Sequence, residues 1–258
     1  MARPHFLILG CQKGGTTTLY DLLCRHPQVE AALEKEVQFF SFRYGEGWAW
    51  YRQQLPLRRS LIGRLRDRPR CGEASPYYLF HPLAAERIAR HAPKARLIVL
   101  LRDPVDRALS QYFHSVRLGL EDLPLMAALA AEPERLQGAD EALARGERHR
   151  SHQEHSYLQR SRYGHQLQRY VQHFPKQQLL VLSSEAFFAD PTGTTQQVWR
   201  FLGLEPAPLS AQPILNQGRG EAAAVSAEER QQLEGLLNGE RNVVKHWLAS
   251  HGPEAHGL

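Results

Sequence analysis

Near the start of this 258-residue chain, a lysine and two glycines separate a short apolar run from a segment rich in threonine. Glycines allow backbone N–H groups to approach an anion closely, the N-terminus of a following helix adds partial positive charge, and the lysine adds a full one. The sequence therefore predicts a cradle for a phosphate-type anion. Its residues are Lys13, Gly14, Gly15, Thr16 and Thr17.

A second anion site is predicted where another apolar run, residues 95–101, ends at Arg102. Pro104 suits the first turn of a helix, and Ser110 lies about two turns along from the arginine. One anion at the start of this helix is therefore within reach of both Arg102 and Ser110. A surface arginine beside an unrelated helix serine is the alternative, and it leaves the order of the two sites unexplained.

The order of residues in both segments is similar to that of sulfotransferases that use 3′-phosphoadenosine 5′-phosphosulfate (PAPS). The first segment places lysine before the glycine pair, whereas the P-loop of nucleotide hydrolases places it after the last glycine. It resembles the family's 5′-phosphosulfate loop. The second, L-R-D-P-x-x-R-x-x-S-x-Y, resembles the segment whose arginine and serine hold the 3′-phosphate. The resemblance implies PAPS as co-substrate and no need for a divalent metal.

The resemblance also implies which residues take part in the reaction. Sulfuryl transfer needs positive charge at the leaving group, which Lys13 can supply, and a base for the acceptor proton. Glu36 matches the glutamate of the family's K-E-x-x-F-F element and is expected to be that base, with Phe39 and Phe40 as apolar neighbours. His114 is the second candidate, because the N-sulfotransferase branch also carries histidine there. An exposed position without a catalytic role is the alternative for either residue.

The K-E-x-x-F-F and G-x-x-W-Y elements are similar to those of heparan-sulfate-type and related bacterial enzymes. Two other positions depart from the family pattern. The first is Ala74, which stands where the heparan-sulfate branch has a lysine near the reacting sulfate. This difference argues against a heparan-type acceptor. It also means that Lys13 is expected to supply more of the positive charge at the reacting group. A later loop, residues 216–220, partly resembles the K-G-R loop that closes over the 3′-phosphate. Its lysine is missing here, so the resemblance assigns contact with the 3′-phosphate only to Gly218 and Arg219.

Apolar runs and amphipathic segments alternate along the chain, which indicates a parallel sheet covered by helices on both faces. Ligands of such sheets bind at the carboxyl ends of the strands, where Lys13 and Arg102 are both expected. The resemblance implies the same architecture, a three-layer αβα fold of the P-loop-NTPase-like sulfotransferase type. The predicted strands are 6–9, 71–74, 97–101 and 178–182, and the predicted helices are 16–25, 82–91, 104–114, 163–174 and 191–202.

Length and composition fit a single α/β domain over residues 1–258. Segment 119–160 is polar and rich in Glu, Arg and His, and we interpret it either as an insertion that acts as a lid over the acceptor cleft or as a solvated helical pair. The net charge of +5 suits a protein that handles anions. Because the arginines are spread along the chain, they do not indicate nucleic acid as the partner.

Several absences in the sequence set further expectations. No apolar run approaches the roughly 20 residues that span a bilayer, and the chain does not start with a secretory signal pattern. The three cysteines lack a paired spacing, so a reducing, cytoplasmic location is expected. His149, His152 and His155 recur every third residue without a further ligand pattern, and no metal site is predicted.

These observations favour a PAPS-dependent sulfotransferase that acts on a hydroxyl or amine of a small-molecule, carbohydrate or natural-product acceptor. Two alternatives remain at this point. A P-loop kinase would use the same sheet and Asp103, but no hydroxyl directly follows Lys13 to hold magnesium. A polyanion-binding module would use the positive charge but not the two ordered sites.

Overall fold

Five parallel strands form a single sheet in the computed structural model, which describes residues 3–56, 69–209 and 225–258. The strands are β1 (Phe6–Gly10), β2 (Val29–Ala31), β3 (Arg70–Ala74), β4 (Arg96–Leu101) and β5 (Leu179–Ser183). Their order across the sheet is β2-β3-β1-β4-β5, and every neighbouring pair is parallel. The predicted α/β class with a central parallel sheet is confirmed.

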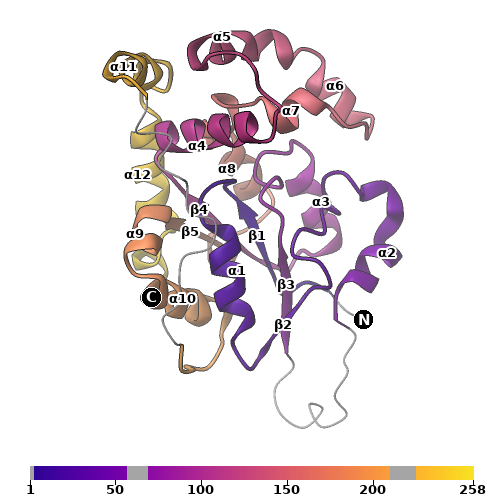
Figure 1. The fold of residues 1–258 in the computed structure, drawn as a ribbon. Coiled ribbons are helices and arrows are strands. Elements are labelled where there is room, and N and C mark those ends of the chain that lie inside the picture. The colour runs from indigo at the N-terminus through magenta and orange to yellow at the C-terminus, as the bar shows by residue number, and fades with distance from the viewer. Residues whose placement is uncertain (1–2, 57–68, 210–224) are drawn as a thin grey trace.

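Helices cover both faces of this sheet (Figure 1). In β1, for example, Ile8 packs with one layer of helices and Leu7 with the other, as a fully buried parallel strand requires. The first layer consists of α1 (Thr16–Cys24), α9 (Ser184–Ala189) and α10 (Pro191–Leu202). The second layer consists of α2 (Gly47–Gln54), α3 (Ala84–His91), α8 (Tyr163–Val171) and α12 (Glu240–His251).

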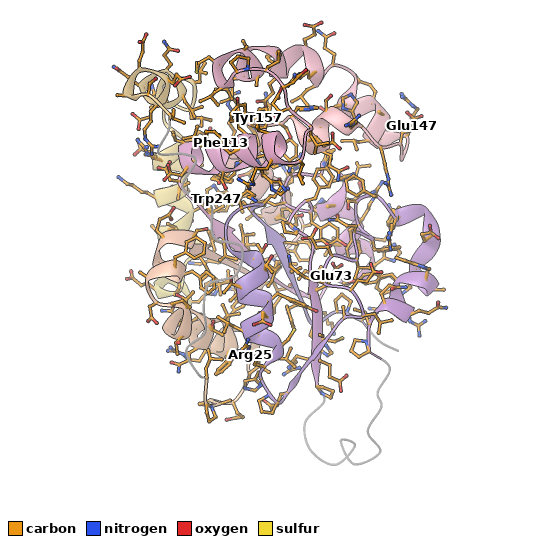
Figure 2. The ribbon with its side chains drawn as sticks, viewed as in Figure 1. Arg25, Glu73, Phe113, Glu147, Tyr157 and Trp247 are labelled. Carbon is orange, nitrogen blue, oxygen red and sulfur yellow. The ribbon has the colours of Figure 1, made fainter. Side chains whose placement is uncertain are left out.

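A third group of helices lies beyond the carboxyl ends of the strands, at the top of Figure 1. Its members are α4 (Pro104–Arg117), α5 (Leu125–Arg135), α6 (Ala139–Ala144), α7 (Arg150–Glu154) and, at one side, α11 (Ala227–Leu236). Segment 119–160 supplies α5 to α7, and it shares with α4 a core that includes Leu109, Leu129 and Tyr157 (Figure 2). The segment is therefore packed on α4 through apolar contacts. Its action as a lid stays a prediction.

The predicted elements occur where the sequence places them, with ends that differ by up to three residues. The helix α8 ends at Val171 rather than Phe174, and the backbone N–H of His173 there bonds to the carbonyl of Tyr170, three residues back instead of four. The sequence pattern does not reveal β2, since only Val29 of its three residues is buried. Short 3₁₀ helices are η1 (Tyr44–Glu46), η3 (Gln159–Ser161), η4 (Lys176–Gln178) and η6 (Glu254–His256). In the described ranges, no helix is long and apolar enough to cross a membrane.

Candidate active site

The loop between β1 and α1 leaves the N-terminus of α1 open to a ligand; we call residues 13–17 the anion loop. Gly15, at the N-cap, has a φ of 96°, a conformation that favours glycine. A Cβ atom on Gly14 would lie 2.9 Å from Cys11 Sγ and 3.0 Å from Ser184 Oγ, so this position also requires glycine. Among the described residues, no side chain caps α1. The backbone N–H groups of its first turn are therefore available to an anion.

Arg102 contacts this loop from the neighbouring strand. Because β4 pairs with β1 and ends at Leu101, Arg102 emerges at the same edge of the sheet. Its guanidinium Nη1 donates a hydrogen bond of 3.2 Å to the carbonyl oxygen of Lys13. The two segments that the sequence predicts to bind anions are thus in direct contact.

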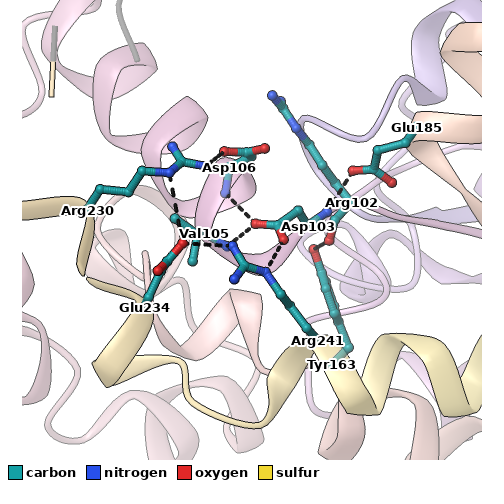
Figure 3. A network of polar contacts seen from close by, with 9 residues as sticks. All are labelled: Arg102, Asp103, Val105, Asp106, Tyr163, Glu185, Arg230, Glu234 and Arg241. Carbon is teal, nitrogen blue, oxygen red and sulfur yellow. Dashed lines mark hydrogen bonds and ion pairs between the residues drawn. The ribbon is translucent and has the colours of Figure 1, made fainter. Parts of the chain in front are cut away.

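Three helices hold the backbone around Arg102 (Figure 3). Tyr163 of α8 donates to the Arg102 carbonyl at 3.1 Å, and Glu185 of α9 accepts from the Asp103 N–H at 2.8 Å. Arg241 of α12 binds the Asp103 carboxylate at 2.6 Å. Although partial burial opposes it, the hydrogen bond from Arg241 holds the pKa of Asp103 below its usual value. An ionised Asp103 that also caps α4 therefore keeps Arg102 at a fixed place beside the anion loop.

Glu36, the predicted base, lies close to the anion loop through its neighbour Lys35. The Nζ of Lys35 donates to Thr17 Oγ1 at 2.8 Å and to Glu36 Oε1 at 3.0 Å. Gln38 Nε2 donates to Glu36 Oε2, also at 3.0 Å. Each carboxylate oxygen of Glu36 therefore has a polar partner, while the side chain remains 45% exposed. These contacts place the carboxylate beside the first turn of α1.

The expected apolar neighbours of Glu36 lie elsewhere, so this detail of the sequence analysis is wrong. Phe39 and Phe40 are fully buried and pack on Tyr51, with ring centroids 4.7 and 5.1 Å from its own. Burying both rings in this aromatic core removes far more apolar surface from water than a place beside an exposed carboxylate. Glu36 is held by charged and polar partners instead.

A buried carboxylate, Glu73 on β3, anchors the segment that carries Glu36 (Figure 2). Its four hydrogen-bond donors are Val37 N at 3.2 Å, Ser75 Oγ at 2.5 Å, Tyr51 OH at 3.2 Å and Tyr78 OH at 2.7 Å. Because Val37 follows Glu36 directly, Glu73 fixes the backbone next to the predicted base. Burial raises the pKa of Glu73 to about 7. The sequence analysis misses this residue, although a lone glutamate in a buried strand is a signal for such a role.

We expect Glu73→Gln to remove a pH dependence of folding stability. The pKa of Glu73 is raised from 4.5 to about 7, so its stabilising contribution is complete below pH 4.5 and is lost as pH rises through 7. The upper bound is about 3 kcal/mol. Urea unfolding of both proteins at pH 5 and pH 8 measures the difference.

Two buried histidines, His81 and His152, change folding stability with pH in the opposite direction from Glu73. Burial lowers their pKa values to about 3 and about 2, so their effect on stability becomes more favourable as pH rises. Their effect is common to wild type and variant, so the difference between the two proteins isolates Glu73. An equal change in stability with pH in both proteins would contradict the assignment.

Ser110 and His114 lie one turn apart on α4 and therefore share a face of that helix. Both side chains are half-buried. Burial lowers the pKa of His114, and the positive charges of Lys13 and Arg117 lower it further. The imidazole is consequently neutral at pH 7 and able to accept a proton. The effect of Lys13 also indicates that this face of α4 is near the anion loop.

Other predicted residues do not join this group. Gly218 and Arg219 lie outside the described residues. The three histidines of the spaced series do not converge, since His152 bonds to a tyrosine hydroxyl, His155 to a backbone carbonyl, and His149 accepts from the N–H of His152. In the part of the chain that the structure describes, no group of three or more His, Cys, Asp or Glu side chains could hold a metal ion.

A fully buried arginine, Arg160, links segment 119–160 to Gln12, the residue before the anion loop. Its guanidinium donates to the side chain of Gln12 and lies over the rings of Tyr77 and Phe80, at 5.0 and 4.9 Å from their centroids. Burial lowers its pKa to about 9, so it is charged at pH 7. The site thus has a cation behind the loop that the sequence analysis misses, because nothing in the local pattern separates it from a surface arginine.

Comparisons with known proteins point to one family. Residues 3–222 match the family model described as "Sulfotransferase domain". The chain is 32% identical over 225 residues to human heparan sulfate glucosamine 3-O-sulfotransferase 3B1, which covers 87% of this chain and 52% of that protein. It is 34% identical over 202 residues to human heparan sulfate glucosamine 3-O-sulfotransferase 6, and this match covers 78% of this chain and 53% of that protein. The chain spans about half the length of the curated relatives it matches.

Solved structures show the same fold. A sulfotransferase from Alicyclobacillus acidocaldarius has a TM-score of 0.64 and 30% identity, and the match covers 95% of this chain and all of that one. Mouse sulfotransferase SULT7A1, solved in complex with PAP, has a TM-score of 0.55 over 96% of this chain and 90% of its own. At 14% identity, the second match supports the fold alone.

Proposed function

The chain belongs to the sulfotransferase domain family, and we propose that it transfers the sulfuryl group of PAPS to a hydroxyl or amine of an acceptor. The contact between Arg102 and Lys13 carries this proposal, since it joins two cationic segments at the carboxyl ends of neighbouring strands. PAPS has a phosphosulfate at the 5′ position and a phosphate at the 3′ position of its ribose. A site that recognises it needs two adjacent groups of anion-binding donors.

In this proposal the anion loop binds the 5′-phosphosulfate, and Arg102 with Ser110 binds the 3′-phosphate. The open N-terminus of α1 supports the first assignment, because no side chain of the described residues caps the N–H groups of its first turn. The position of Arg102 beside the anion loop supports the second. The start of α4 adds no support, because the side chain of Asp103 already accepts from its N–H groups. The family resemblance adds Gly218 and Arg219 as residues that close over the 3′-phosphate.

The chemistry then divides between the two sides of the site. The acceptor oxygen or nitrogen forms a bond to sulfur as the bond from sulfur to the 5′-phosphate oxygen breaks. Lys13 stabilises the negative charge that grows on that leaving oxygen. Glu36 takes the proton of the acceptor, with the neutral His114 as the second candidate for this role.

The acceptor class stays broad. The two human relatives are named for action on heparan sulfate glucosamine. This chain carries Ala74 at the position where the heparan-type pattern has lysine, and Ala74 is fully buried. We therefore propose a small molecule, carbohydrate or natural product as acceptor and do not assign heparan sulfate.

Transfer of radiolabelled sulfate from PAPS into extracts of candidate acceptors tests the proposal. We expect the rate to be unchanged in excess EDTA, because Gly14 follows Lys13 at the place where a P-loop kinase carries the hydroxyl that holds magnesium. Activity that disappears with EDTA and returns with magnesium would favour the kinase alternative.

A further inference from the structure

Lys35 occupies the space between the two sides of the proposed site. Its Nζ lies 2.8 Å from Thr17 Oγ1 on the donor side and 3.0 Å from Glu36 Oε1 on the acceptor side. The backbone at Lys35 is fixed as well, because its carbonyl accepts a hydrogen bond of 3.0 Å from the N–H of Ala74, at the end of β3. The ammonium group is therefore held at a defined point and is not a freely moving surface charge.

The ammonium group also has room for one more partner. A lysine has three N–H donors, and two of them are directed at Thr17 and Glu36. Within the described residues, the structure gives Lys35 no further acceptor, and its side chain is 26% exposed. A third acceptor would come from a ligand between the anion loop and Glu36, which is where the transferred group must pass.

Resting on the proposed function, we propose that Lys35 is a catalytic residue whose ammonium group binds an oxygen of the sulfuryl group, both in bound PAPS and throughout transfer. As the acceptor atom bonds to sulfur, the electron pair of the breaking sulfur–oxygen bond leaves with the 5′-phosphate of PAP, and the acceptor proton goes to Glu36. Lys35 keeps its own protons throughout. Its charge stabilises the oxygens on sulfur, whereas Lys13 stabilises the leaving oxygen, so the two lysines have separate tasks.

The matched ligands PAPS and PAP test this role, because they differ by the sulfuryl group alone. In the absence of acceptor, we expect Lys35→Met to weaken the binding of PAPS by about 10- to 100-fold and to leave the affinity for PAP unchanged. With acceptor, kcat should fall by about 10²–10³-fold, and Lys35→Arg should recover part of both losses. Isothermal calorimetry and radiolabelled sulfate transfer give these values.

Lys94→Met is the matched control. Lys94 is exposed and precedes β4, so it lies at the opposite edge of the sheet from the anion loop. This variant should bind both nucleotides and turn over as wild type does.

Two outcomes would overturn the proposal. Equal losses of PAPS and PAP affinity in Lys35→Met would mean that Lys35 only supports the loop through Thr17. A loss of kcat with both affinities intact would mean that Lys35 only positions Glu36. Failure of the proposed function is a different result, since the wild-type protein would then bind neither nucleotide.

Discussion

Glu36→Gln is expected to lower kcat by about 10²–10⁴-fold, the range for loss of a general base. The amide keeps the shape of the side chain, and its oxygen can still accept from Lys35 or Gln38, but it no longer takes a proton. The affinity for PAP should stay near the wild-type value, because Lys35 connects Glu36 to the anion loop through its hydrogen bonds to both. Steady-state transfer from PAPS and calorimetry with PAP measure the two quantities separately.

Glu34→Gln provides the control for this experiment. Glu34 is exposed and pairs with Arg43 at 3.6 Å, so its replacement removes one nearby carboxylate without touching the site. Near-normal turnover in Glu36→Gln, together with loss of turnover in His114→Ala, would make His114 the base and would refute the assignment of Glu36.

Arg102→Ala is expected to weaken PAP by about 10- to 100-fold more than it weakens 5′-AMP. The 3′-phosphate, which 5′-AMP lacks, forms charge-assisted hydrogen bonds worth about 1.5–3 kcal/mol each. The ratio of the two affinities is the relevant quantity, because the variant also loses the hydrogen bond to the Lys13 carbonyl, which can affect both ligands. Calorimetric titration with each nucleotide gives the ratio.

Arg90→Ala is the matched control, since Arg90 lies on α3 and pairs with Glu86 at 2.9 Å, remote from the anion loop. The ratio of PAP affinity to 5′-AMP affinity in this variant should equal the ratio in the wild-type protein. If Arg102→Ala weakened PAP and 5′-AMP by the same factor, the 3′-phosphate would bind elsewhere.

The parts of this fold that sequence predicts are those that local pattern determines. Glycine at position 15 follows from the backbone path of the loop, and the apolar run before the loop identifies β1. The turn into α4 is equally local, because Asp103 and the proline after it form a helix start by themselves. The parallel order of the strands then brings Lys13 and Arg102 to one edge of the sheet.

The parts that sequence does not predict depend on residues far apart in the chain. Arg241 binds Asp103 across 138 positions, and Arg160 reaches Gln12 across 148. The spacing of neighbouring residues in the sequence does not predict such long-range contacts. The prediction of the side chains around Glu36 fails for a related reason. Phe39 and Phe40 are close to Glu36 in the sequence, but their packing on Tyr51 in the aromatic core decides where their rings lie.

The central claim is that two adjacent anion sites recognise the 5′ and 3′ ends of PAPS. Calorimetric titration of the wild-type protein with PAP, with 5′-AMP and with magnesium ATP tests it most directly. We predict that PAP binds tightest, by about 10²-fold or more over 5′-AMP, since at least two hydrogen bonds to the 3′-phosphate distinguish them. Equal affinities for PAP and 5′-AMP, or a preference for magnesium ATP, would contradict the account.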